Sequence, residues 1–517
     1  MLVAFVVVVS IIYAIYSFYT WHHSYWKRRG VPGPPPRFFS GHLKELSSIR
    51  NPPLFKLHEW TKKYGKVYAI YEGMRKVLVI SDIDMINEIF VKRFDCFYER
   101  KLYVMAGPQD GERLRVHSFE AKGKRWKRLR VMTNTMFTNN GLKQALPIIT
   151  DTGDHMLIAL REQAAGGKAV DVLKLCQTFT MDIIKRLVCG QPECRWDDTE
   201  WIQIVRSIFG FDQDRILFYL AAGMPTFQPF LRKLYYYMMQ FENFPYAPMF
   251  RNIERAVDDR MREREDMVHR GETPPSVDFI DMLLDARLEA DEVDMSDTPG
   301  EIGELTIRKT MHREEIIAQC FIFIIGGFES TANQLSTLLY DLSIRPEIVE
   351  RMREEMDEHC TDEITFDSVN SLQYTDAVLK EAFRMHTLTS FAVSRVCTTK
   401  CTVGDIDIEP GTFVQADVYS VHHDKELWGE DADEFRPERF LESSTLKHSL
   451  QWMPFGAGPR TCPGRKLTLV EQKVALTNIL RNFDVYRGPN TEKSLHMMGS
   501  LSLGPDSLTL YFKERTH

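Results

Sequence analysis

The sequence predicts a mainly helical protein with a smaller β-rich part, preceded by one N-terminal transmembrane helix. The first 26 residues contain no Lys, Arg, Asp or Glu and are mostly apolar. Apolar residues recur at helical spacing along much of the remaining chain, and the longest such segment is 312–344. The expected helices are 53–64, 82–94, 142–164, 170–189, 312–344, 375–384 and 465–480, and the β-rich runs are 67–71, 76–80 and 403–418.

Composition places the chain among ordinary globular proteins. Its 517 residues are 44% hydrophobic and 26% charged, which is enough chain for a large core. The formal net charge is −7, so nothing indicates nucleic-acid binding. The nine cysteines are an odd number and show no metal-site spacing, which favours reduced thiols and a cytosolic catalytic part.

We expect the N-terminal segment to anchor the protein in a membrane. Residues 2–20 are almost all apolar or aromatic, and this run is long enough to cross a bilayer as a helix. No basic segment precedes it and no clear small-residue cleavage site follows it, which disfavours a removed signal peptide. The alternative is an ordinary buried helix.

Aromatic and basic residues follow the apolar run. Trp21, Tyr25 and Trp26 have the positions of an interfacial aromatic belt, and Lys27-Arg28-Arg29 come next. Because basic flanks stay in the cytosol, we expect the amino terminus in the lumen and the body in the cytosol. The expected division is a membrane anchor at 1–26, a basic and proline-rich hinge at 27–36, and a catalytic domain at 37–517.

One loop, residues 455–464, places Cys462 among glycines and prolines, directly before the predicted helix 465–480. Glycine lets the backbone bend tightly and come close to a neighbouring group. Unpaired N–H groups and aligned peptide dipoles at a helix N-terminus favour a thiolate. A large flat group carrying a metal could approach such a thiolate. The alternative is a small buried hydrophobic side chain, the commonest role of a lone cysteine.

The long helix at 312–344 has two adjacent glycines near its centre, Gly326 and Gly327, followed by Glu329 and Ser330. Each glycine costs about 1 kcal/mol relative to alanine inside a helix. We expect them to make room for a ligand, and a local kink to free a carbonyl. We also expect the interruption to make this segment too short for a second membrane span. A kink required only by packing is the alternative.

A basic run, 124–130, lies on a further predicted helix. Trp126 and Arg130 are four residues apart and share a face, while Lys127 and Arg128 point roughly the other way. A solvated basic face is the usual meaning of such a run. Elsewhere, Glu381 and Arg384 are three apart on one helix, a pair that is commonly exposed and worth little.

Several of these segments resemble motifs of one family, the cytochrome P-450 family. Residues 455–464 match its haem-thiolate signature through Phe455, Gly456, Arg460, Cys462 and Gly464. The glycine-containing helix resembles its oxygen-binding motif through Gly326, Gly327, Glu329 and Thr331. Its Glu-x-x-Arg and Pro-Glu-Arg-Phe motifs are matched by Glu381, Arg384 and Arg439. The resemblance covers residues 31–517.

The resemblance implies the P-450 fold and a haem b cofactor, with the Cys462 thiolate as the axial ligand of the iron. It also implies that Trp126, Arg130, Arg395 and, with weaker support, Arg100 hold the haem propionates. The remaining basic residues of 124–130 would face an acidic reductase. Glu381, Arg384 and Arg439 would form a buried network that locks the core on the Cys462 side. Residues 209–230 would cap the substrate channel at the membrane surface, and 496–501 would line the pocket.

The implied activity is monooxygenation of a lipophilic small molecule, with electrons from NADPH through an NADPH-cytochrome reductase and with cytochrome b5 as a possible helper. Glu329, Ser330 and Thr331 would deliver protons to bound oxygen. The implied location is the endoplasmic reticulum membrane. The closest similarity is to the branch that holds the 3A-type drug-oxidising enzymes and thromboxane synthase. The alternatives are an isomerase or dehydratase that rearranges a lipid peroxide without a reductase, and a non-catalytic haem-binding protein.

Two departures from the family pattern stand out. Ser330 stands where a proton-relaying threonine is usual, and serine lacks the methyl group that restricts the rotamer. The proline that commonly follows the Glu-x-x-Arg helix is absent from residues 385–388, which affects the shape of the pocket.

Overall fold

The computed structural model describes the whole chain except residues 106–113, 197–199, 210–215, 242–245, 287–309, 362, 390, 443–445, 500 and 516–517. The acidic segment 289–304, which the sequence predicts to be a surface loop, lies outside the described residues. The longer helices are α1 Leu2–His23, α4 Pro53–Tyr64, α6 Gly123–Asn134, α7 Asn139–Ala164, α8 Val172–Cys189, α9 Glu200–Phe209, α10 Ile216–Gly223, α11 Gln228–Phe241, α12 Tyr246–His269, α14 Arg313–Leu342, α15 Pro346–His359, α17 Gln373–Met385 and α20 Arg465–Asn482. The shorter helices are α2 Tyr25–Arg28, α3 Leu43–Leu46, α5 Ile83–Asn87, α13 Phe279–Asp285, α16 Phe366–Ser371, α18 Val418–His422 and α19 Lys425–Trp428.

The fold is mainly helical, as predicted, and the strands form only small sheets in the described part of the chain. The largest sheet has the order β1-β2-β7-β4, with β1 Val67–Glu72, β2 Arg75–Ile80, β7 Phe413–Ala416 and β4 Ser394–Val396. The others are β3 Ala169–Asp171 with β11 Thr509–Glu514 and β8 Phe483–Tyr486, β5 Cys401–Val403 with β6 Ile406–Ile408, and β9 Met497–Met498 with β10 Gly504–Pro505. The predicted β-rich runs 67–71 and 76–80 form a hairpin around Glu72-Gly73, as the sequence favours, because β1 and β2 pair antiparallel from Val67 opposite Ile80 to Glu72 opposite Arg75.

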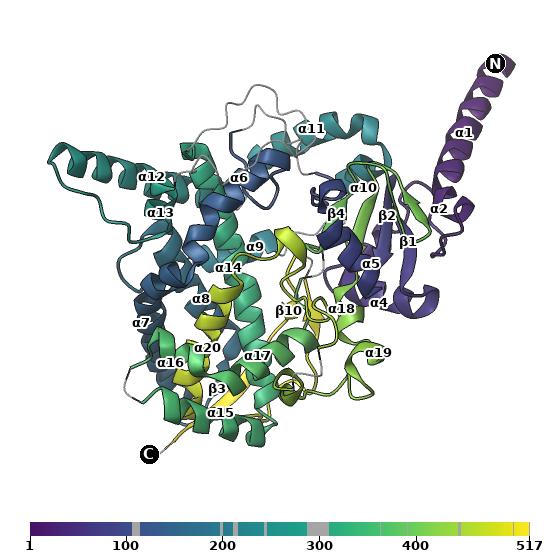
Figure 1. Cartoon of the computed structure of the whole chain (residues 1–517). Coiled ribbons are helices and arrows are strands. Elements are labelled where there is room, and N and C mark those ends of the chain that lie inside the picture. The colour runs from purple at the N-terminus through teal and green to yellow at the C-terminus, as the bar shows by residue number, and fades with distance from the viewer. Residues whose placement is uncertain are drawn as a thin grey trace.

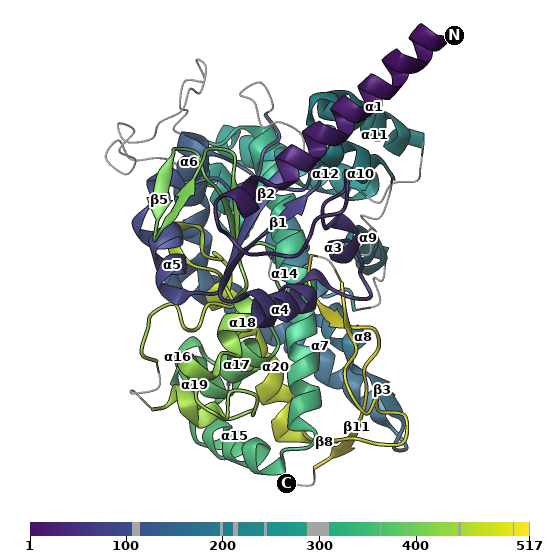
Figure 2. The ribbon, with the colours of Figure 1, turned by 90° about the vertical axis from the view of Figure 1, so that its right-hand side faces the viewer.

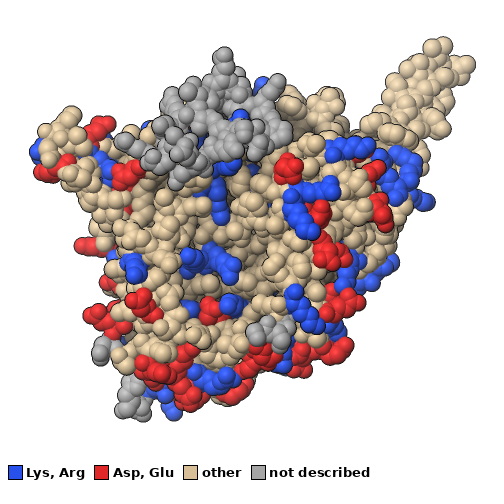
Figure 3. Space-filling view, viewed as in Figure 1, with Lys and Arg blue, Asp and Glu red and all other residues tan. Residues whose placement is uncertain are grey.

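The apolar helix α1 projects from the body (Figures 1 and 2) and shows neither blue nor red atoms in Figure 3. It is 22 residues long with a mean hydropathy of 2.3 over its most apolar window, and only 6% of that window is buried, so by length and composition it could cross a membrane. Its last turns contact the body, because Tyr19 Oη donates to the Gly223 carbonyl at 2.8 Å. The rings of His22 and His23 contact the carbonyls of Met74 and Gly73 in the β1–β2 turn.

The predicted aromatic belt is only partly found at the surface. Trp21 is exposed, but Trp26 is 2% exposed and packs with the core beside the largest sheet. Tyr25 is half-buried, between the side chains of Arg29 and Lys76. The expectation that Trp26 lies at a membrane interface is therefore wrong, because the core beside the largest sheet covers it, whereas the expectation for Tyr25 stays a prediction.

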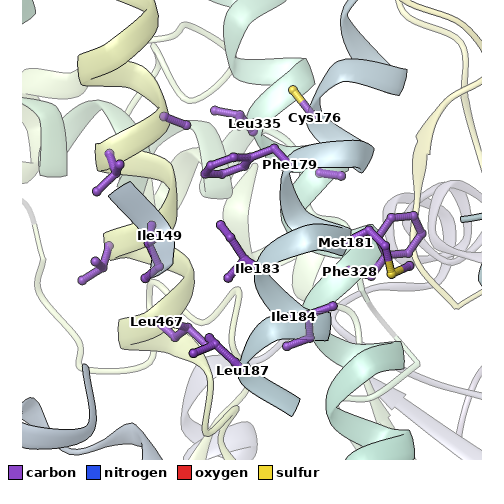
Figure 4. Packing of buried hydrophobic residues seen from close by; sticks show 14 of the residues in the cluster. Ile149, Cys176, Phe179, Met181, Ile183, Ile184, Leu187, Phe328, Leu335 and Leu467 are labelled. Carbon is purple, nitrogen blue, oxygen red and sulfur yellow. The ribbon is translucent and has the colours of Figure 1, made fainter. Parts of the chain in front are cut away.

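The helical core is built around α14, which packs against α8, while α7 packs against both α8 and α20. Figure 4 shows Ile149, Ile183, Leu335 and Leu467 as members of one apolar cluster to which all four helices contribute. A capping box of His312 and Glu315 starts α14. The helix then continues through Gly326-Gly327 without a break, so the expected interruption is wrong. With 61% of its most apolar stretch buried, α14 matches the expected core helix, although its 30 residues would be long enough to span a membrane.

Candidate functional site

The Cys462 loop, the middle of α14, the start of α20 and the segment before β4 surround a cavity of about 520 Å³. Most of its wall is apolar or aromatic, which is typical of a small-molecule site. Of the residues predicted from the sequence to bind a cofactor or act in catalysis, those that line it are Arg100, Trp126, Arg130, Gly326, Gly327, Ser330, Thr331, Arg395, Phe455, Gly456, Arg460, Cys462 and Gly464. Segments from five regions of the sequence therefore meet at one place.

The loop that carries Cys462 is held from within. The Cys462 amide donates to the Phe455 carbonyl at 2.9 Å, and the Thr461 hydroxyl donates to the same oxygen at 3.2 Å. Gly458 has φ +69°, and a Cβ there would lie 1.9 Å from the Phe90 carbonyl oxygen. Only glycine therefore allows this loop to lie against the helical turn Glu88–Lys92, which continues α5 as a π-helix.

The thiol of Cys462 opens into the cavity, three residues before α20 begins at Arg465. Burial raises the pKa of Cys462, although the backbone at Gly464 and the cations Arg130 and Arg100 act in the opposite direction. The backbone at the start of α20 therefore acts in the predicted direction, but burial opposes it, and the thiolate state of Cys462 stays a prediction. Metal coordination deprotonates a thiol, so a bound metal would supply what the chain lacks.

Four arginines gather beside this loop. Arg460 holds three segments together, because its guanidinium donates to the carbonyls of Tyr98 at 2.6 Å, Ala121 at 2.6 Å and Phe119 at 3.5 Å. It also lies over the Trp126 ring, 4.5 Å from the centroid. Arg460 thus has backbone partners for most of its donors.

Arg100 and Arg395 are less well satisfied. Arg100 donates to the Arg460 carbonyl at 2.9 Å, and Arg395 donates to the carbonyls of Ser394 and Ala457 at 2.8 and 3.0 Å. The buried Nε atoms of both have no hydrogen-bond partner. No ion pair joins Arg100, Arg130, Arg395 or Arg460 to a carboxylate within the described part of the chain.

Burial lowers the pKa of all four arginines, and repulsion by a neighbouring arginine adds to this for Arg100, Arg395 and Arg460. The pKa of Arg100 falls to about 10 because it is desolvated, and desolvation together with Arg100 holds the pKa of Arg395 well below its usual value. The same causes, with Arg395 added, act on Arg460, and desolvation lowers the pKa of Arg130. Buried cations without anions are costly, so this cluster is suited to an anionic ligand.

Across the cavity, α14 presents a small polar surface. The Ser330 hydroxyl donates to the Gly326 carbonyl at 3.0 Å, one turn back along the helix. A Cβ at Gly326 would meet nothing within 4 Å, so this glycine leaves open space as expected. A Cβ at Gly327 would lie 2.8 Å from Ile184 Cδ1, so Gly327 also serves the packing of α14 on α8. Thr331 lines the cavity and is buried.

Glu329, the predicted proton donor next to Ser330, lies outside the cavity wall. The described residues that line the cavity do not include it, although they include its neighbour Ser330. Its Oε2 is buried and has no hydrogen-bond partner. Burial raises the pKa of Glu329 to about 8, with Arg206 of α9 acting in the opposite direction. The carboxyl is therefore mostly protonated at neutral pH.

The predicted Glu381 network forms in the structure. Arg384 donates to Glu381 through Nε and Nη2, both at 2.8 Å, and Arg439 donates to it through Nε at 2.9 Å. All three side chains are fully buried. The Arg436 backbone amide adds a fourth hydrogen bond to the carboxylate at 2.8 Å. These contacts tie α17 to the segment that precedes the Cys462 loop.

The basic helix α6 differs from the prediction at two positions. Arg128 is 7% exposed and forms an ion pair with Glu315 at the start of α14, and Arg125 reaches the same carboxylate at 3.2 Å. They therefore do not form part of a surface for a reductase. The burial of Glu315 behind α6 explains the difference, because a buried acid needs cationic partners.

Sequence reasoning missed Glu471, which lies on α20 and lines the cavity. It is 3% exposed, and burial raises its pKa to about 8. A signal was present, since Glu471 follows Leu467 by four residues on the apolar face of the helix. The phenyl rings of Phe119, Phe137 and Phe391 also line the cavity and were not predicted.

The residues present fit a haem. A cavity with a thiol on one wall, an open space at Gly326 on the other and unpaired guanidiniums at its edge suits a flat group with a metal and carboxylates. Within the described residues, no group of three or more His, Cys, Asp or Glu could hold a metal ion alone. A metal at Cys462 would therefore need ligands from a cofactor.

Comparison with known proteins agrees with this site. Residues 31–512 match the family model described as "Cytochrome P450". The chain is 39% identical to a Caenorhabditis elegans protein named putative cytochrome P450 CYP13A2, over 98% of each chain. It is 36% identical to putative cytochrome P450 cyp-13B1 of the same organism, over 99% of each chain. The chain therefore belongs to the cytochrome P450 family.

Proposed function

We propose that this protein is a haem-thiolate monooxygenase that inserts one oxygen atom of O2 into a lipophilic small molecule, using electrons that a partner reductase takes from NADPH. The observation that carries the proposal is that Cys462, Ser330 and two arginines whose buried Nε atoms have no hydrogen-bond partner, Arg100 and Arg395, all line one apolar cavity. Haem would supply the redox chemistry of oxygen activation when bound. The chain supplies ligation, placement, a dry pocket and protons.

Each wall of the cavity has a separate task in this proposal. Cys462 would ligate the iron, and the cationic edge of Arg100, Arg130 and Arg395, with Trp126, would hold the propionates. Arg460 would fix the loop through its three carbonyl contacts. The apolar and aromatic wall would exclude water and hold the lipophilic substrate.

The proton path would begin at groups that are protonated at neutral pH. Ser330 can pass a proton from its hydroxyl, because its present acceptor, the Gly326 carbonyl, is a replaceable partner on its own helix. Glu329 holds a proton at pH 7 but lies outside the cavity wall, so we propose that it supplies protons from behind α14. Thr331 would support the relay from the next position on the helix.

The remaining assignments follow from family membership and α1. We propose that α1 anchors the protein in the endoplasmic reticulum membrane with the catalytic domain in the cytosol, that an NADPH-cytochrome reductase is the electron donor, and that cytochrome b5 can assist. We also propose that the protein belongs to the branch of 3A-type enzymes and thromboxane synthase.

The first test is the absorption spectrum of the reduced protein with carbon monoxide. A strongly red-shifted Soret band is expected from thiolate ligation, and Cys462→His should abolish the shift. The same spectrum for this variant and the wild type would overturn the assignment. Oxygen consumption that depends on reductase and substrate would support the proposed reaction, whereas turnover of a lipid hydroperoxide without NADPH would support a peroxide-rearranging enzyme.

A further inference from the structure

Three of the nine cysteines lie together outside the Cys462 site. Cys96 ends the short 3₁₀ turn Phe94–Cys96, Cys397 comes directly after β4, and Cys401 begins β5. The Cys401 sulfur accepts side-chain hydrogen bonds from both other thiols, so it is the central member of the cluster. The described wall of the large cavity includes none of the three, and the proposed function uses none of them.

Backbone hydrogen bonds fix the positions of these thiols. Thr398 donates to the Cys96 carbonyl through its amide at 2.8 Å and through its hydroxyl at 2.9 Å. Cys397 Sγ donates to the Ile408 carbonyl at 3.6 Å, and Ile408 is the residue opposite Cys401 in the β5–β6 pair. In Figure 2, β5 and α5, which precedes the Cys96 turn, lie on the same edge of the molecule. The fold therefore brings the three cysteines together from two distant parts of the chain.

The three thiols differ in their access to solvent. Cys96 is partly exposed, whereas Cys401 is 8% exposed and Cys397 is fully buried. Burial raises the pKa of all three thiols, and Asp95 adds to this at Cys96, whereas Arg93 lowers the pKa of both Cys96 and Cys401. All three thus rest as thiols at neutral pH, in agreement with the sequence prediction. Cys96 is the member that a small soluble oxidant meets first.

We propose that Cys96 and Cys401 are a site of reversible oxidation by peroxides, at which the two thiols become a disulfide. In the first step the O–O bond of the peroxide breaks, the Cys96 sulfur gains an OH group, and water leaves when the peroxide is hydrogen peroxide. In the second step the Cys401 sulfur attacks the Cys96 sulfur, the S–S bond forms, and the OH group leaves as water with the Cys401 proton. The two thiols lose two electrons, which the peroxide gains.

The disulfide would attach β5 to a segment that supports the haem site. Cys96 follows the π-helical turn Glu88–Lys92, which contains Phe90. Gly458 of the Cys462 loop lies so close to this turn that a Cβ there would be 1.9 Å from the Phe90 carbonyl oxygen. The Phe90 ring also lies under the Arg395 guanidinium, 4.4 Å from the centroid. Oxidation would therefore restrain one support of the loop and of a propionate-binding arginine, and we expect slower loss of haem.

The test maps disulfides in the full-length, haem-loaded protein in lipid nanodiscs after brief treatment with hydrogen peroxide. Remaining thiols are alkylated, the monomer is isolated by non-reducing electrophoresis, and trypsin then places the three cysteines on separate peptides, 94–100, 396–400 and 401–425. We expect peptides 94–100 and 401–425 to be found linked about tenfold more often than in untreated protein, and dithiothreitol to separate them.

Cys194 is the control within the same samples. It is also partly exposed, but the groups that act on its thiol are Asp182, Arg186 and Asp151, and no second thiol is among them. It should therefore appear in no linked peptide. Absence of the link between 94–100 and 401–425, or a link in which 396–400 predominates, would overturn the proposed pair.

Two variants separate the roles of the thiols. Cys401→Ser should abolish the link and leave a sulfenic acid on Cys96 that dimedone labels, whereas Cys397→Ser should change the yield of the link less than about twofold. After peroxide treatment, haem should pass to apomyoglobin several-fold more slowly from the wild type than from Cys401→Ser. Equal rates would show that the disulfide does not restrain the haem site. Neither measurement involves turnover, so loss of NADPH-dependent oxidation would count against the proposed function and not against this pair.

Discussion

Replacement of Glu381 by alanine removes the one anion that Arg384 and Arg439 share. The carboxylate accepts three hydrogen bonds from the two guanidiniums and one from the Arg436 amide, and all three charged side chains are inaccessible to solvent. Arg384 would remain without a counter-ion and Arg439 would keep only the partly exposed Asp431, 3.4 Å away, which costs roughly 3–5 kcal/mol. The figure stays in this range because both arginines keep backbone carbonyl acceptors.

The free energy of unfolding of a domain is roughly 5–15 kcal/mol, so this loss is a large share of it. We therefore expect Glu381→Ala to unfold at a much lower urea concentration than the wild type and to lose haem. Lys380→Ala on the same helix is the matched control. Lys380 pairs with Asp376 at 2.8 Å, but both are partly exposed, so its loss should cost about 1 kcal/mol or less. Urea titration followed by circular dichroism, with haem content measured on the same samples, compares the two. Equal midpoints and full haem content in both variants would refute the reasoning.

Three further changes give separate readouts. Arg395→Met should speed the transfer of haem to apomyoglobin without lowering the stability of the haem-free protein. The reason is that the substitution removes a buried charge that has no anion beside it. A haem-free variant less stable than the haem-free wild type would contradict this. Ser330→Thr should lower peroxide release during turnover, because the added methyl group restricts the hydroxyl that donates to Gly326, and unchanged release would remove the idea. Burial raises the pKa of Glu471 from 4.5 to about 8, so its contribution to stability is full below pH 4.5 and is lost as the pH rises to about 8. Glu471→Gln should flatten this fall, which reaches about 1.4 kcal/mol per pH unit, and equal slopes for variant and wild type would show that Glu471 does not titrate in this range.

Features encoded by neighbouring residues could be predicted from the sequence. Helix α4 has the predicted bounds, and the β1–β2 hairpin follows from two β-rich runs around Glu72-Gly73. The Cys462 loop could also be predicted, because its glycines and prolines lie within ten residues of one another. In each case the signal and the structure occupy the same short stretch of chain.

Partners that are distant in sequence could not be predicted in this way. Arg128 looked like an exposed base because Glu315, its partner, is 187 residues away. Trp26 looked like an interfacial residue because nothing nearby shows that the sheet core covers it. For Glu329 the difficulty was rotation, since the order of residues on α14 does not say which side faces the cavity. Glu471 was hidden among the apolar residues of α20.

The contacts of Tyr19, His22 and His23 with α10 and the β1–β2 turn hold the last turns of α1 against the body. If α1 spans a bilayer, its tilt then fixes which face of the catalytic domain meets the lipid surface. A shortened protein that begins after Trp26 would lose these contacts and also uncover the Gly223 carbonyl. Solubility gained by such a truncation would therefore come with a change in the surface of α10 and the β1–β2 turn that α1 now contacts.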